Sequence, residues 1–296
     1  MTVTVNEESA GGRTRRRVLS VRDLAIEFQG DTAIAAIRGA SFDLYEGEVV
    51  AIVGESGSGK SVTARAILGL MAPNQRITAG AIEITRYGDD GTPVTRDIAQ
   101  MSERQIRREI CGRRVAMVFQ DALTCLDPTM TVGKQVMEGM QEHFGLDRRA
   151  ARARAIELLA EVGIDQPERR FKQYPHQLSG GMCQRVNIAI ALSCNPDILI
   201  CDEPTTALDV TIQLRILELL TRLQAERGLS VIFITHDLGV VATVADYVNV
   251  MYAGRIIEQG TAEQVFYDPR HPYTWGLLSA MPDLATDASE LFAIPG

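Results

Sequence analysis

The residues Gly54 to Ser61 have the composition and spacing of a loop that binds phosphate groups. They read Gly-Glu-Ser-Gly-Ser-Gly-Lys-Ser and match G-x-x-x-x-G-K-[ST], a pattern whose backbone N–H groups surround phosphate oxygens. The apolar stretch 49–53 before the loop is predicted to be a buried strand, and residues 62–68 have helical spacing. We expect Lys60 to reach the outer phosphates of a nucleotide and the Ser61 hydroxyl to hold Mg²⁺. The order strand, loop, helix therefore predicts a site for a nucleoside triphosphate.

Polar side chains follow three more apolar stretches of the chain. One stretch ends at Gln120, a second ends in the neighbouring carboxylates Asp202 and Glu203, and a third is followed by His236. The apolar run before Asp202 is typical of a strand buried on both faces, as in parallel sheets. Ligands of such sheets gather outside the carboxyl ends of the strands, so we expect these side chains and the phosphate loop to meet at one place.

These residue types suit hydrolysis of the terminal phosphate of a nucleotide. We expect Asp202 to hold Mg²⁺ through water and Glu203 to orient or deprotonate the attacking water. His236 is expected to contact the γ-phosphate, and Gln120 to complete the Mg²⁺ shell or position the water. Taken singly, a Gln at a strand end is more often a surface amide and a His is more often structural. Their order after a phosphate loop favours the catalytic interpretation.

A second anion-binding element is predicted at Leu178–Met182. Ser179, Gly180 and Gly181 open a predicted helix, and the N–H groups at a helix N-terminus bind anions. One chain rarely needs two phosphate cradles for one nucleotide. We therefore predict a head-to-tail dimer in which this loop contacts the nucleotide held by the other subunit.

The elements that must position these residues have an α/β pattern. Alternating apolar residues predict antiparallel strands at 18–28 and 33–44, ahead of the phosphate loop. Later in the chain, an amphipathic stretch predicts helices inserted into the α/β core. The predicted organisation is a disordered polar tail (1–16), a nucleotide-binding core with an antiparallel β subdomain (17–120), a helical subdomain (121–195), the completion of the core (196–260) and a C-terminal appendage (261–296).

The composition of the 296-residue chain limits its partners and location. The formal net charge of −8 argues against nucleic-acid binding, which requires a basic face. The five cysteines are scattered without a CxxC pattern, which does not favour metal ligation. No apolar run approaches the ~20 residues of a membrane span, and the N-terminus lacks the apolar region of a signal peptide. We expect a soluble, cytoplasmic protein that can still dock on a membrane protein.

Together these residues resemble the ATP-binding subunit of ABC transporters, from about Val18 onward. The matching motifs are Walker A (Gly54–Ser61), the Q-loop (Gln120), the signature loop (Leu178–Met182), Walker B with its catalytic Glu (Ile198–Glu203), the D-loop (Ala207–Asp209) and the switch histidine (His236). The resemblance implies a phosphate-loop, RecA-like ABC ATPase core with an antiparallel β subdomain and an inserted helical subdomain. It also implies ATP and Mg²⁺ as cofactors.

The resemblance assigns a role to each site residue. Phe28 matches the adenine-stacking position, whereas the strand pattern alone fits a core-facing aromatic equally well. Asp209 is implied to contact the other subunit of a dimer. The implied site comprises ATP-binding residues (Phe28, Gly54, Glu55, Ser56, Gly57, Ser58, Gly59, Lys60, Ser61, Val62), residues that bind ATP in trans (Leu178, Ser179, Gly180, Gly181, Met182), catalytic residues (Glu203, His236, Gln120) and Mg²⁺ ligands (Ser61, Gln120, and Asp202 through water).

Finer details resemble the oligopeptide/dipeptide and nickel importer branch of this family. The stretches that carry this likeness are 174–182, 202–211, 234–241, 271–274 and 294–296. There are two departures near the signature loop, where Met182 replaces the Gln of the general pattern and Cys183 stands where the branch usually has Arg. Members of the branch usually continue past their Ile-Pro-Gly into a segment with clustered cysteines.

The branch also implies partners and a location. The implied direct partners are a second ABC ATPase subunit, homologous or identical, and two membrane-spanning permease subunits. An extracellular substrate-binding protein is an indirect partner. The implied location of the chain is peripheral, at the cytoplasmic face of the cell membrane. The leading hypothesis is an ATPase subunit that energises peptide import, with nickel, opine or glutathione import as alternatives. A non-transport ABC ATPase usually carries coiled-coil insertions or two fused cassettes, and a GTPase needs an Asn-Lys-x-Asp motif. The sequence contains neither feature.

Overall fold

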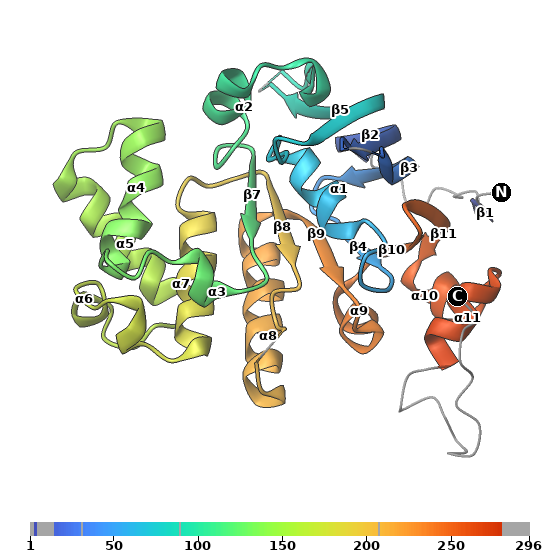
Figure 1. The fold of residues 1–296 in the computed structure, drawn as a ribbon. Coiled ribbons are helices and arrows are strands. Elements are labelled where there is room, and N and C mark those ends of the chain that lie inside the picture. The colour runs from blue at the N-terminus through green and yellow to red at the C-terminus, as the bar shows by residue number, and fades with distance from the viewer. Residues whose placement is uncertain (1–2, 5–14, 31, 89, 207, 280–296) are drawn as a thin grey trace. The chain divides into compact units, whose positions relative to one another are not determined.

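Two groups of elements organise the chain, and each is described by itself. Residues 1–101 together with 230–296 form unit 1, and residues 102–229 form unit 2. The computed structural model describes residues 3–4, 15–30, 32–88, 90–206 and 208–279, and Figure 1 shows the fold.

Unit 1 contains a four-stranded antiparallel sheet, of which two strands precede the phosphate loop in the chain and two follow it. Its strands lie in the order β3-β2-β5-β6. Apolar residues of β2 alternate toward the core, with Leu24 and Ile26 fully buried, as the period of a strand requires. The bounds of the four strands are β2 (Arg17–Phe28), β3 (Ile34–Tyr45), β5 (Gln75–Tyr87) and β6 (Pro93–Asp97).

The second set of strands in unit 1 surrounds β4, which leads into the phosphate loop. β4 pairs in parallel with β9 on one side and with β10 on the other, and β11 returns antiparallel to β10. β4 and β9 are rich in Val and Ile and buried on both faces, as parallel strands generally are. The bounds are β1 (Val3–Thr4), β4 (Val49–Val53), β9 (Ser230–Thr235), β10 (Tyr247–Tyr252) and β11 (Arg255–Thr261).

Three helices of unit 1 pack on β4 and β10 to form one apolar cluster. Val53 and Val250 from the strands meet Val241 of α9, Val265 of α10 and Tyr273 of α11 in this cluster. Figure 1 shows α10 and α11 next to β11 at the red end of the chain. The helices of unit 1 are α1 (Lys60–Ile67), the short 3₁₀ helix η1 (Ile98–Gln100), α9 (Leu238–Val244), α10 (Ala262–Tyr267) and α11 (Pro272–Ser279).

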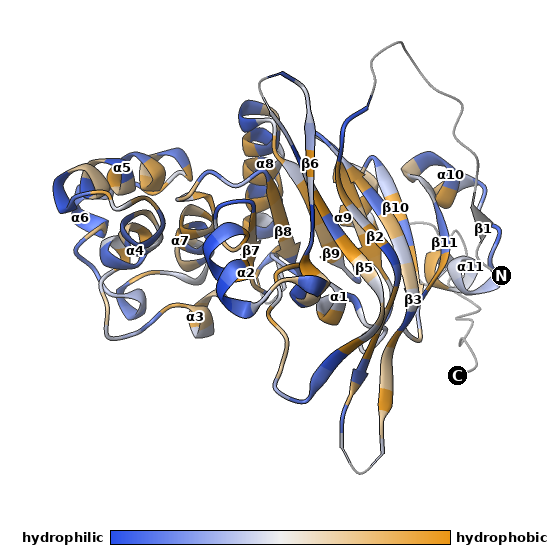
Figure 2. Ribbon diagram, turned by 90° about the horizontal axis from the view of Figure 1, so that it is seen from above, coloured by the Kyte–Doolittle hydropathy of each residue, from blue (hydrophilic) through white to orange (hydrophobic). Residues whose placement is uncertain are grey.

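Unit 2 combines two parallel strands with most of the helices of the described chain. β7 pairs with β8, and β8 is hydrophobic along almost its whole length, whereas α6 is hydrophilic (Figure 2). Its elements are α2 (Glu103–Glu109), β7 (Val115–Val118), α3 (Ala122–Cys125), α4 (Val132–Phe144), α5 (Arg148–Glu161), α6 (Pro167–Arg170), η2 (Pro175–Gln177), α7 (Gly180–Leu192), β8 (Ile198–Asp202) and α8 (Val210–Arg227).

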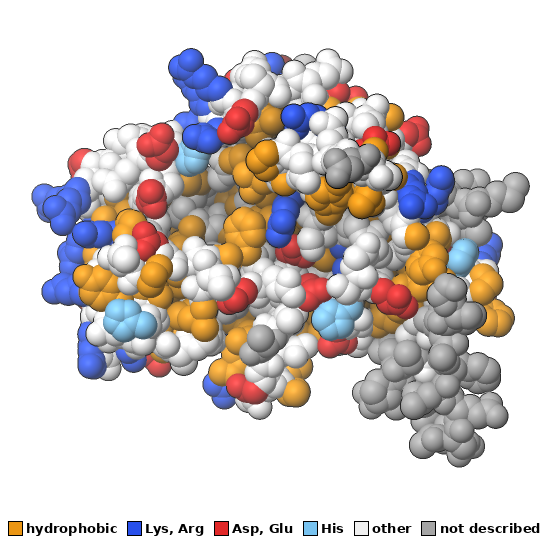
Figure 3. Space-filling view, in the orientation of Figure 1, with side chains coloured by type: hydrophobic (Ala, Val, Ile, Leu, Met, Phe, Trp, Pro, Cys, Tyr) orange, Lys and Arg blue, Asp and Glu red, His pale blue; other side chains and the backbone are white. Residues whose placement is uncertain are grey.

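The helices α4, α5 and α7 pack against one another through apolar faces and leave a charged outer face. Figure 3 shows Lys and Arg side chains along the left edge, where α4 to α6 lie in Figure 1. This solvated basic face follows from the arginine-rich sequence of α5, whose Ala155 and Leu158 point inward.

The predicted fold class is confirmed, since the strands before the phosphate loop are antiparallel and those around β4 and β8 are parallel. The boundaries of the predicted segments remain a prediction. Within the predicted disordered tail, Val3–Thr4 pairs in parallel with β11, while residues 1–2 and 5–14 lie outside the described residues. Residues 280–296 of the predicted appendage lie outside them as well. Among the described residues, the helices are too short or too polar to cross a membrane.

Candidate nucleotide site

The phosphate loop of unit 1 closes around the side chain of Lys60. The Lys60 ammonium donates to the carbonyl of Gly54 at 2.7 Å and to the carbonyl of Glu55 at 2.8 Å. The backbone N–H of Ser58 donates to the same Glu55 carbonyl at 3.2 Å. Lys60 is only 5% exposed, so its charge is held inside the curve of the loop. An ammonium in this place attracts an anion such as phosphate.

Neighbouring strands fix the path of the loop. Gly54 has a positive φ of 149°, and a Cβ on it would lie 2.1 Å from the carbonyl oxygen of Met251 in β10. At the other end of the loop, the N–H of Gly254 donates to the carbonyl of Ser58 at 2.9 Å. Gly254 belongs to the turn between β10 and β11, so this hairpin holds the loop from both ends.

The groups at the start of α1 fit a phosphate. Gly59 is the N-cap of α1 and, as a glycine, provides no side-chain cap to the N–H groups of the first turn. The hydroxyl of Ser58 is buried and has no hydrogen-bond partner within the described residues. An uncapped helix N-terminus beside an ammonium is a ready anion site. Ser61 and Val62 lie in the first turn of α1 and are partly buried, and Ser56 and Gly57 lie exposed in the loop.

The fold of unit 1 brings His236 to the phosphate loop. β4 and β9 pair in parallel with Val53 opposite Thr235. Gly54 and His236 therefore directly follow the carboxyl ends of two neighbouring strands, each one residue beyond the pair Val53 and Thr235. His236 is exposed, and Asp237 caps α9 by accepting from the N–H groups of its first turn. This adjacency agrees with the predicted meeting of strand ends.

Phe28 lies at the last position of β2 and is partly buried. It pairs with Ile34 of β3 and Gln75 of β5. The position suits either an adenine platform or a strand aromatic, so its role stays a prediction.

Unit 2 places the remaining polar strand ends together. β7 and β8 pair with Val118 opposite Cys201, so Gln120 and Asp202 come from the carboxyl ends of neighbouring parallel strands. The amide of Gln120 donates to Oε2 of Glu203 at 2.9 Å. Asp202 is 3% exposed, and burial raises the pKa of the adjoining Cys201 thiol, which keeps that neighbour uncharged. The predicted proximity of Gln120 and Glu203 is thus present within unit 2.

Glu203 is held in an unusual conformation. Its φ is +46°, in the left-handed region that non-glycine residues seldom occupy. The hydroxyl of Thr206 donates to Glu203 Oε2 at 2.9 Å, and the N–H of Thr206 donates to the Glu203 carbonyl at 3.2 Å. Backbone strain of this kind persists only where the surroundings determine it, and it is concentrated at functional sites.

The signature loop forms the start of α7. Ser179 is the N-cap and its hydroxyl accepts from the N–H of Met182 at 3.4 Å. Ser179 and Gly180 are exposed, while Leu178 and Met182 are partly buried. Gly181 is buried, and a Cβ on it would lie 2.8 Å from Cγ2 of Ile212 in α8. The exposed Ser179-Gly180 end is therefore the accessible part of this loop.

Two contacts within unit 2 tie the signature helix and the D-loop to their surroundings. The amide of Gln184 in α7 donates to the carbonyl of Pro204 at 2.7 Å, directly after Glu203. Asp209 is exposed and caps α8 by accepting from the N–H of Ile212 at 2.9 Å. Within this chain, the Asp209 carboxylate therefore serves as the cap of α8. The contact of Asp209 to a second subunit remains a prediction.

Sequence patterns did not indicate four of these contacts. Thr206 and Gln184 support the Glu203 loop, Gly254 anchors the phosphate loop, and Tyr273 accepts from the N–H of Glu55 at 3.1 Å. For two of these contacts, however, the sequence held a local feature that could have indicated them. Thr206 follows Glu203 by three residues, the spacing of a local side-chain contact, and Gly254 lies in a predicted hairpin turn.

The predicted site residues thus fall into two groups. Unit 1 joins the phosphate loop to His236, and unit 2 joins Gln120, Asp202 and Glu203 and places the signature loop at the start of α7. The hydroxyl of Ser61, the carboxylate of Asp202 and the amide of Gln120 carry oxygen atoms, the ligand type that Mg²⁺ prefers.

The chain matches two families and several known proteins. Residues 37–206 match the family described as ABC transporter, and residues 257–296 match the C-terminal region of oligopeptide/dipeptide transporters. The oligopeptide transport ATP-binding protein OppD of Bacillus subtilis is 54% identical over 283 residues, which cover 95% of this chain and 76% of that protein. The corresponding protein AmiE of Streptococcus pneumoniae is 51% identical over 280 residues, covering 94% and 76%.

Solved structures of similar fold are ATP-binding cassettes. A dimeric cassette in a post-hydrolysis state, bound to ADP and Pi, has a TM-score of 0.70 and 28% identity, and covers 82% of this chain and 98% of that one. The cbiO1 protein of Clostridium perfringens, part of an ABC transporter complex, has a TM-score of 0.69 and 30% identity, and covers 86% and 92%. The chain therefore belongs to the ABC transporter family, as an ATPase of the branch that contains the oligopeptide and dipeptide transport ATP-binding proteins.

Proposed function

We propose that this chain is the ATP-hydrolysing subunit that energises import of peptides through a membrane ABC transporter. The observation that carries the proposal is the identity of 51% to 54%, over about 95% of the chain, with proteins named for oligopeptide and dipeptide transport. The match of residues 257–296 to the C-terminal region of such transporters supports the same substrate class.

In this proposal the phosphate loop binds the phosphates of ATP. Lys60 neutralises negative charge on the β- and γ-phosphates, and the N–H groups at the start of α1 donate to phosphate oxygens. Phe28 stacks on adenine. Ser61, Gln120 and, through water, Asp202 would hold Mg²⁺, which would supply positive charge opposite the phosphate oxygens.

The hydrolytic step is assigned to Glu203. Its carboxylate orients a water molecule and accepts a proton as the water oxygen attacks the γ-phosphorus and the bond to the β-phosphate oxygen breaks. The hydrogen bonds from Gln120 and Thr206 hold the carboxylate in place, which supports a fixed rather than a mobile base. His236, next to the loop at the end of β9, contacts the γ-phosphate.

The site requires a second ATPase subunit. The exposed Ser179-Gly180 end of α7 is suited to bind the γ-phosphate of ATP held by a partner, and Asp209 contacts that partner. We further propose two membrane-spanning permease subunits, an extracellular substrate-binding protein reached through them, and a peripheral location at the cytoplasmic face of the cell membrane.

Reconstitution tests the substrate class. The tagged chain is purified with its membrane subunits and substrate-binding protein, placed in liposomes, and assayed for ATP-dependent uptake of a labelled dipeptide, a labelled pentapeptide, Ni²⁺ and glutathione. Peptide uptake that is abolished by Lys60→Ala supports the proposal. Uptake of Ni²⁺ or glutathione alone overturns the substrate assignment, and co-purification with ribosomes or DNA in place of membrane subunits overturns the transport role.

A further inference from the structure

A helix outside the nucleotide motifs touches the phosphate loop directly. The hydroxyl of Tyr273 in α11 accepts a hydrogen bond from the backbone N–H of Glu55 at 3.1 Å. The carbonyl of the same residue accepts from Lys60 at 2.8 Å. Both polar atoms of the Glu55 backbone are thus hydrogen-bonded, the carbonyl to Lys60 of the loop and the N–H to Tyr273 of α11.

The side chain of Tyr273 is packed in the interior of unit 1. Its side chain belongs to the apolar cluster of unit 1 and the residue is 6% exposed, while its ring lies 4.5 Å from the ring of Tyr252. Burial raises the pKa of the phenol, so the hydroxyl stays protonated and neutral at physiological pH. The neutral phenol oxygen is the atom through which the Tyr273 side chain accepts the hydrogen bond from the loop.

The segment before Tyr273 is fixed to the sheet. The buried carboxylate of Glu258 in β11 accepts from the N–H of Arg270 at 2.6 Å and from the N–H of His271 at 3.1 Å. His271 Nδ1 in turn accepts from the N–H of Tyr273 at 3.1 Å, and Pro272 occupies the first position of the helix, where its missing N–H costs nothing. A continuous set of contacts therefore runs from β11 through the start of α11 to the phosphate loop.

We propose that Tyr273 is a positioning residue for ATP binding, which holds the Glu55 peptide in place and couples the C-terminal helix α11 to the state of the phosphate loop. The inference rests on the proposed function, because it requires that ATP binds at this loop. A loop held in its binding conformation loses less conformational freedom when the ligand arrives, so the anchor raises affinity for ATP.

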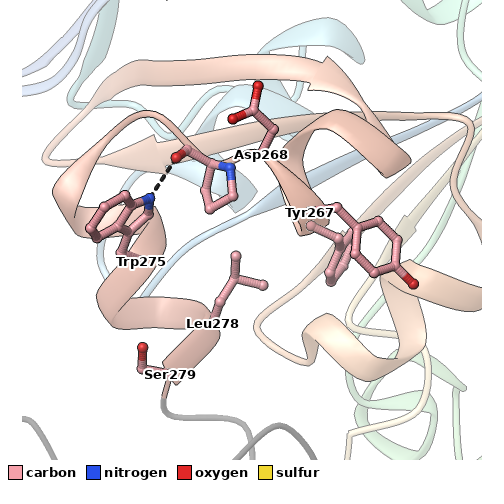
Figure 4. A pocket seen from close by; sticks show the side chains of 7 residues that line it. Tyr267, Asp268, Trp275, Leu278 and Ser279 are labelled. Atoms are coloured by element: carbon pink, nitrogen blue, oxygen red, sulfur yellow. Dashed lines mark hydrogen bonds between the residues drawn. The ribbon is translucent and has the colours of Figure 1, made fainter.

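The chain carries its own reporter for this coupling. Trp275 is its only tryptophan and lies two residues after Tyr273 in the same helix. Figure 4 shows its indole N–H donating to the carbonyl of Pro269 at the rim of a pocket that Tyr267 and Leu278 also line. Trp275 is 58% exposed, so a movement of α11 that changes the solvent exposure of the indole is expected to change its fluorescence.

The test compares Tyr273→Phe with the unaltered full chain. ATP affinity is measured by calorimetry in the presence of Mg²⁺, and Trp275 emission is recorded at saturating ATP. We expect Kd for ATP to rise roughly threefold to tenfold, as loss of one hydrogen bond predicts. We expect the ATP-dependent change in Trp275 emission to be reduced, while ATP turnover at saturating ATP in the assembled transporter stays within about twofold.

Control variants separate positioning from folding. Tyr267→Phe removes a phenol hydroxyl from the neighbouring helix, where the residue is 86% exposed, and should leave both readouts unchanged. Glu258→Gln weakens the anchor at β11 and should raise Kd in the same direction as Tyr273→Phe. An unchanged Kd and an unchanged Trp275 response in Tyr273→Phe overturn the inference, whereas failure of the unaltered chain to bind ATP overturns the proposed function together with it.

Discussion

The side-chain amide of Gln120 donates to Oε2 of Glu203, and the hydroxyl of Thr206 donates to the same oxygen, both at 2.9 Å. Two uncharged donors therefore orient the carboxylate. This arrangement suits a base that acts on water.

Replacement of Glu203 by Gln tests that role. Glu203→Gln is expected to bind ATP and to dimerise, because the amide keeps the shape of the side chain, but to lose turnover by about 100-fold or more, since an amide cannot take the proton. Phosphate release and ATP-dependent dimerisation in sedimentation are the measurements. Glu226→Gln, on the exposed face of α8, is the matched control. Turnover within a few-fold of the unaltered chain would show that Glu203 is not the base.

Thr206 is expected to act by positioning Glu203. Thr206→Val removes the hydroxyl and keeps the branched shape, so kcat should fall about threefold to tenfold while KM for ATP stays nearly constant. Thr206→Ser retains the hydroxyl and should restore most of the rate. Equal impairment of both variants would contradict a role through the hydrogen bond.

The two glycines of the signature loop should respond differently to alanine. A Cβ on Gly181 would lie 2.8 Å from Cγ2 of Ile212, whereas a Cβ on Gly180 meets only Cδ2 of Leu208, at 3.9 Å. Gly181→Ala is therefore expected to lower the free energy of unfolding by about 1–3 kcal/mol, as overpacking does. Gly180→Ala should keep the stability within about 0.5 kcal/mol. Urea unfolding gives both values.

Gly180→Ala has a second expected effect. Since Gly180 is exposed at the end of α7 proposed to meet the partner's ATP, a methyl group there should weaken ATP-dependent dimerisation while ATP binding to the single subunit is retained. Normal dimerisation of this variant would argue that the loop does not approach the partner's nucleotide closely.

An ion pair of unit 2 gives a prediction for pH. Arg227 near the end of α8 donates to both carboxylate oxygens of Glu161, from Nε at 2.7 Å and from a terminal nitrogen at 2.6 Å, and these bonds hold the pKa of the Glu161 carboxyl below its usual range. A pKa lowered by folding stabilises the folded state above the pKa of the unfolded state. That stabilisation is lost as pH falls through the folded value.

Glu161→Gln should therefore destabilise unit 2 at pH 7 by about 1–2 kcal/mol, since the pair is mostly shielded from solvent and doubly hydrogen-bonded. The difference from the unaltered chain should shrink below pH 4.5, the ordinary value for Glu, and vanish at still lower pH. Denaturant unfolding across this range measures it. Glu138→Gln, on the exposed face of α4, should show no such trend, and a constant difference at every pH would exclude the ion pair as the cause.

Much of the fold was predictable because its strands carry strong local patterns. The apolar run before Asp202 and the alternation over β2 specify buried and half-buried strands regardless of their partners. Helix starts were less accurate. The helical spacing after the phosphate loop starts at residue 62, whereas α1 begins at Lys60 with Gly59 as its N-cap, because the end of the motif itself forms the first turn.

The contacts that orient the site residues were not predictable in the same way. The hydrogen bond from the Glu55 N–H to the Tyr273 hydroxyl joins residues 218 positions apart, and no periodicity encodes such a contact. The strained φ of Glu203 is likewise set by the packing around it rather than by its own preference. The spacing of the motifs therefore identifies the reactive residues, whereas the long-range contacts that orient their side chains are seen only in the folded structure.

The carbonyl of Met251 beside Gly54 bears on how such sequences are to be interpreted across evolution. That carbonyl would lie 2.1 Å from a Cβ at position 54, so any side chain there is rejected by β10 whether or not a nucleotide is bound. A descendant that had lost its ATPase activity would still be selected to keep this glycine for folding alone. Retention of Gly54 is thus weak evidence that a related protein is an active enzyme. Lys60 and Glu203 are better markers for distinguishing an active ATPase from a pseudoenzyme.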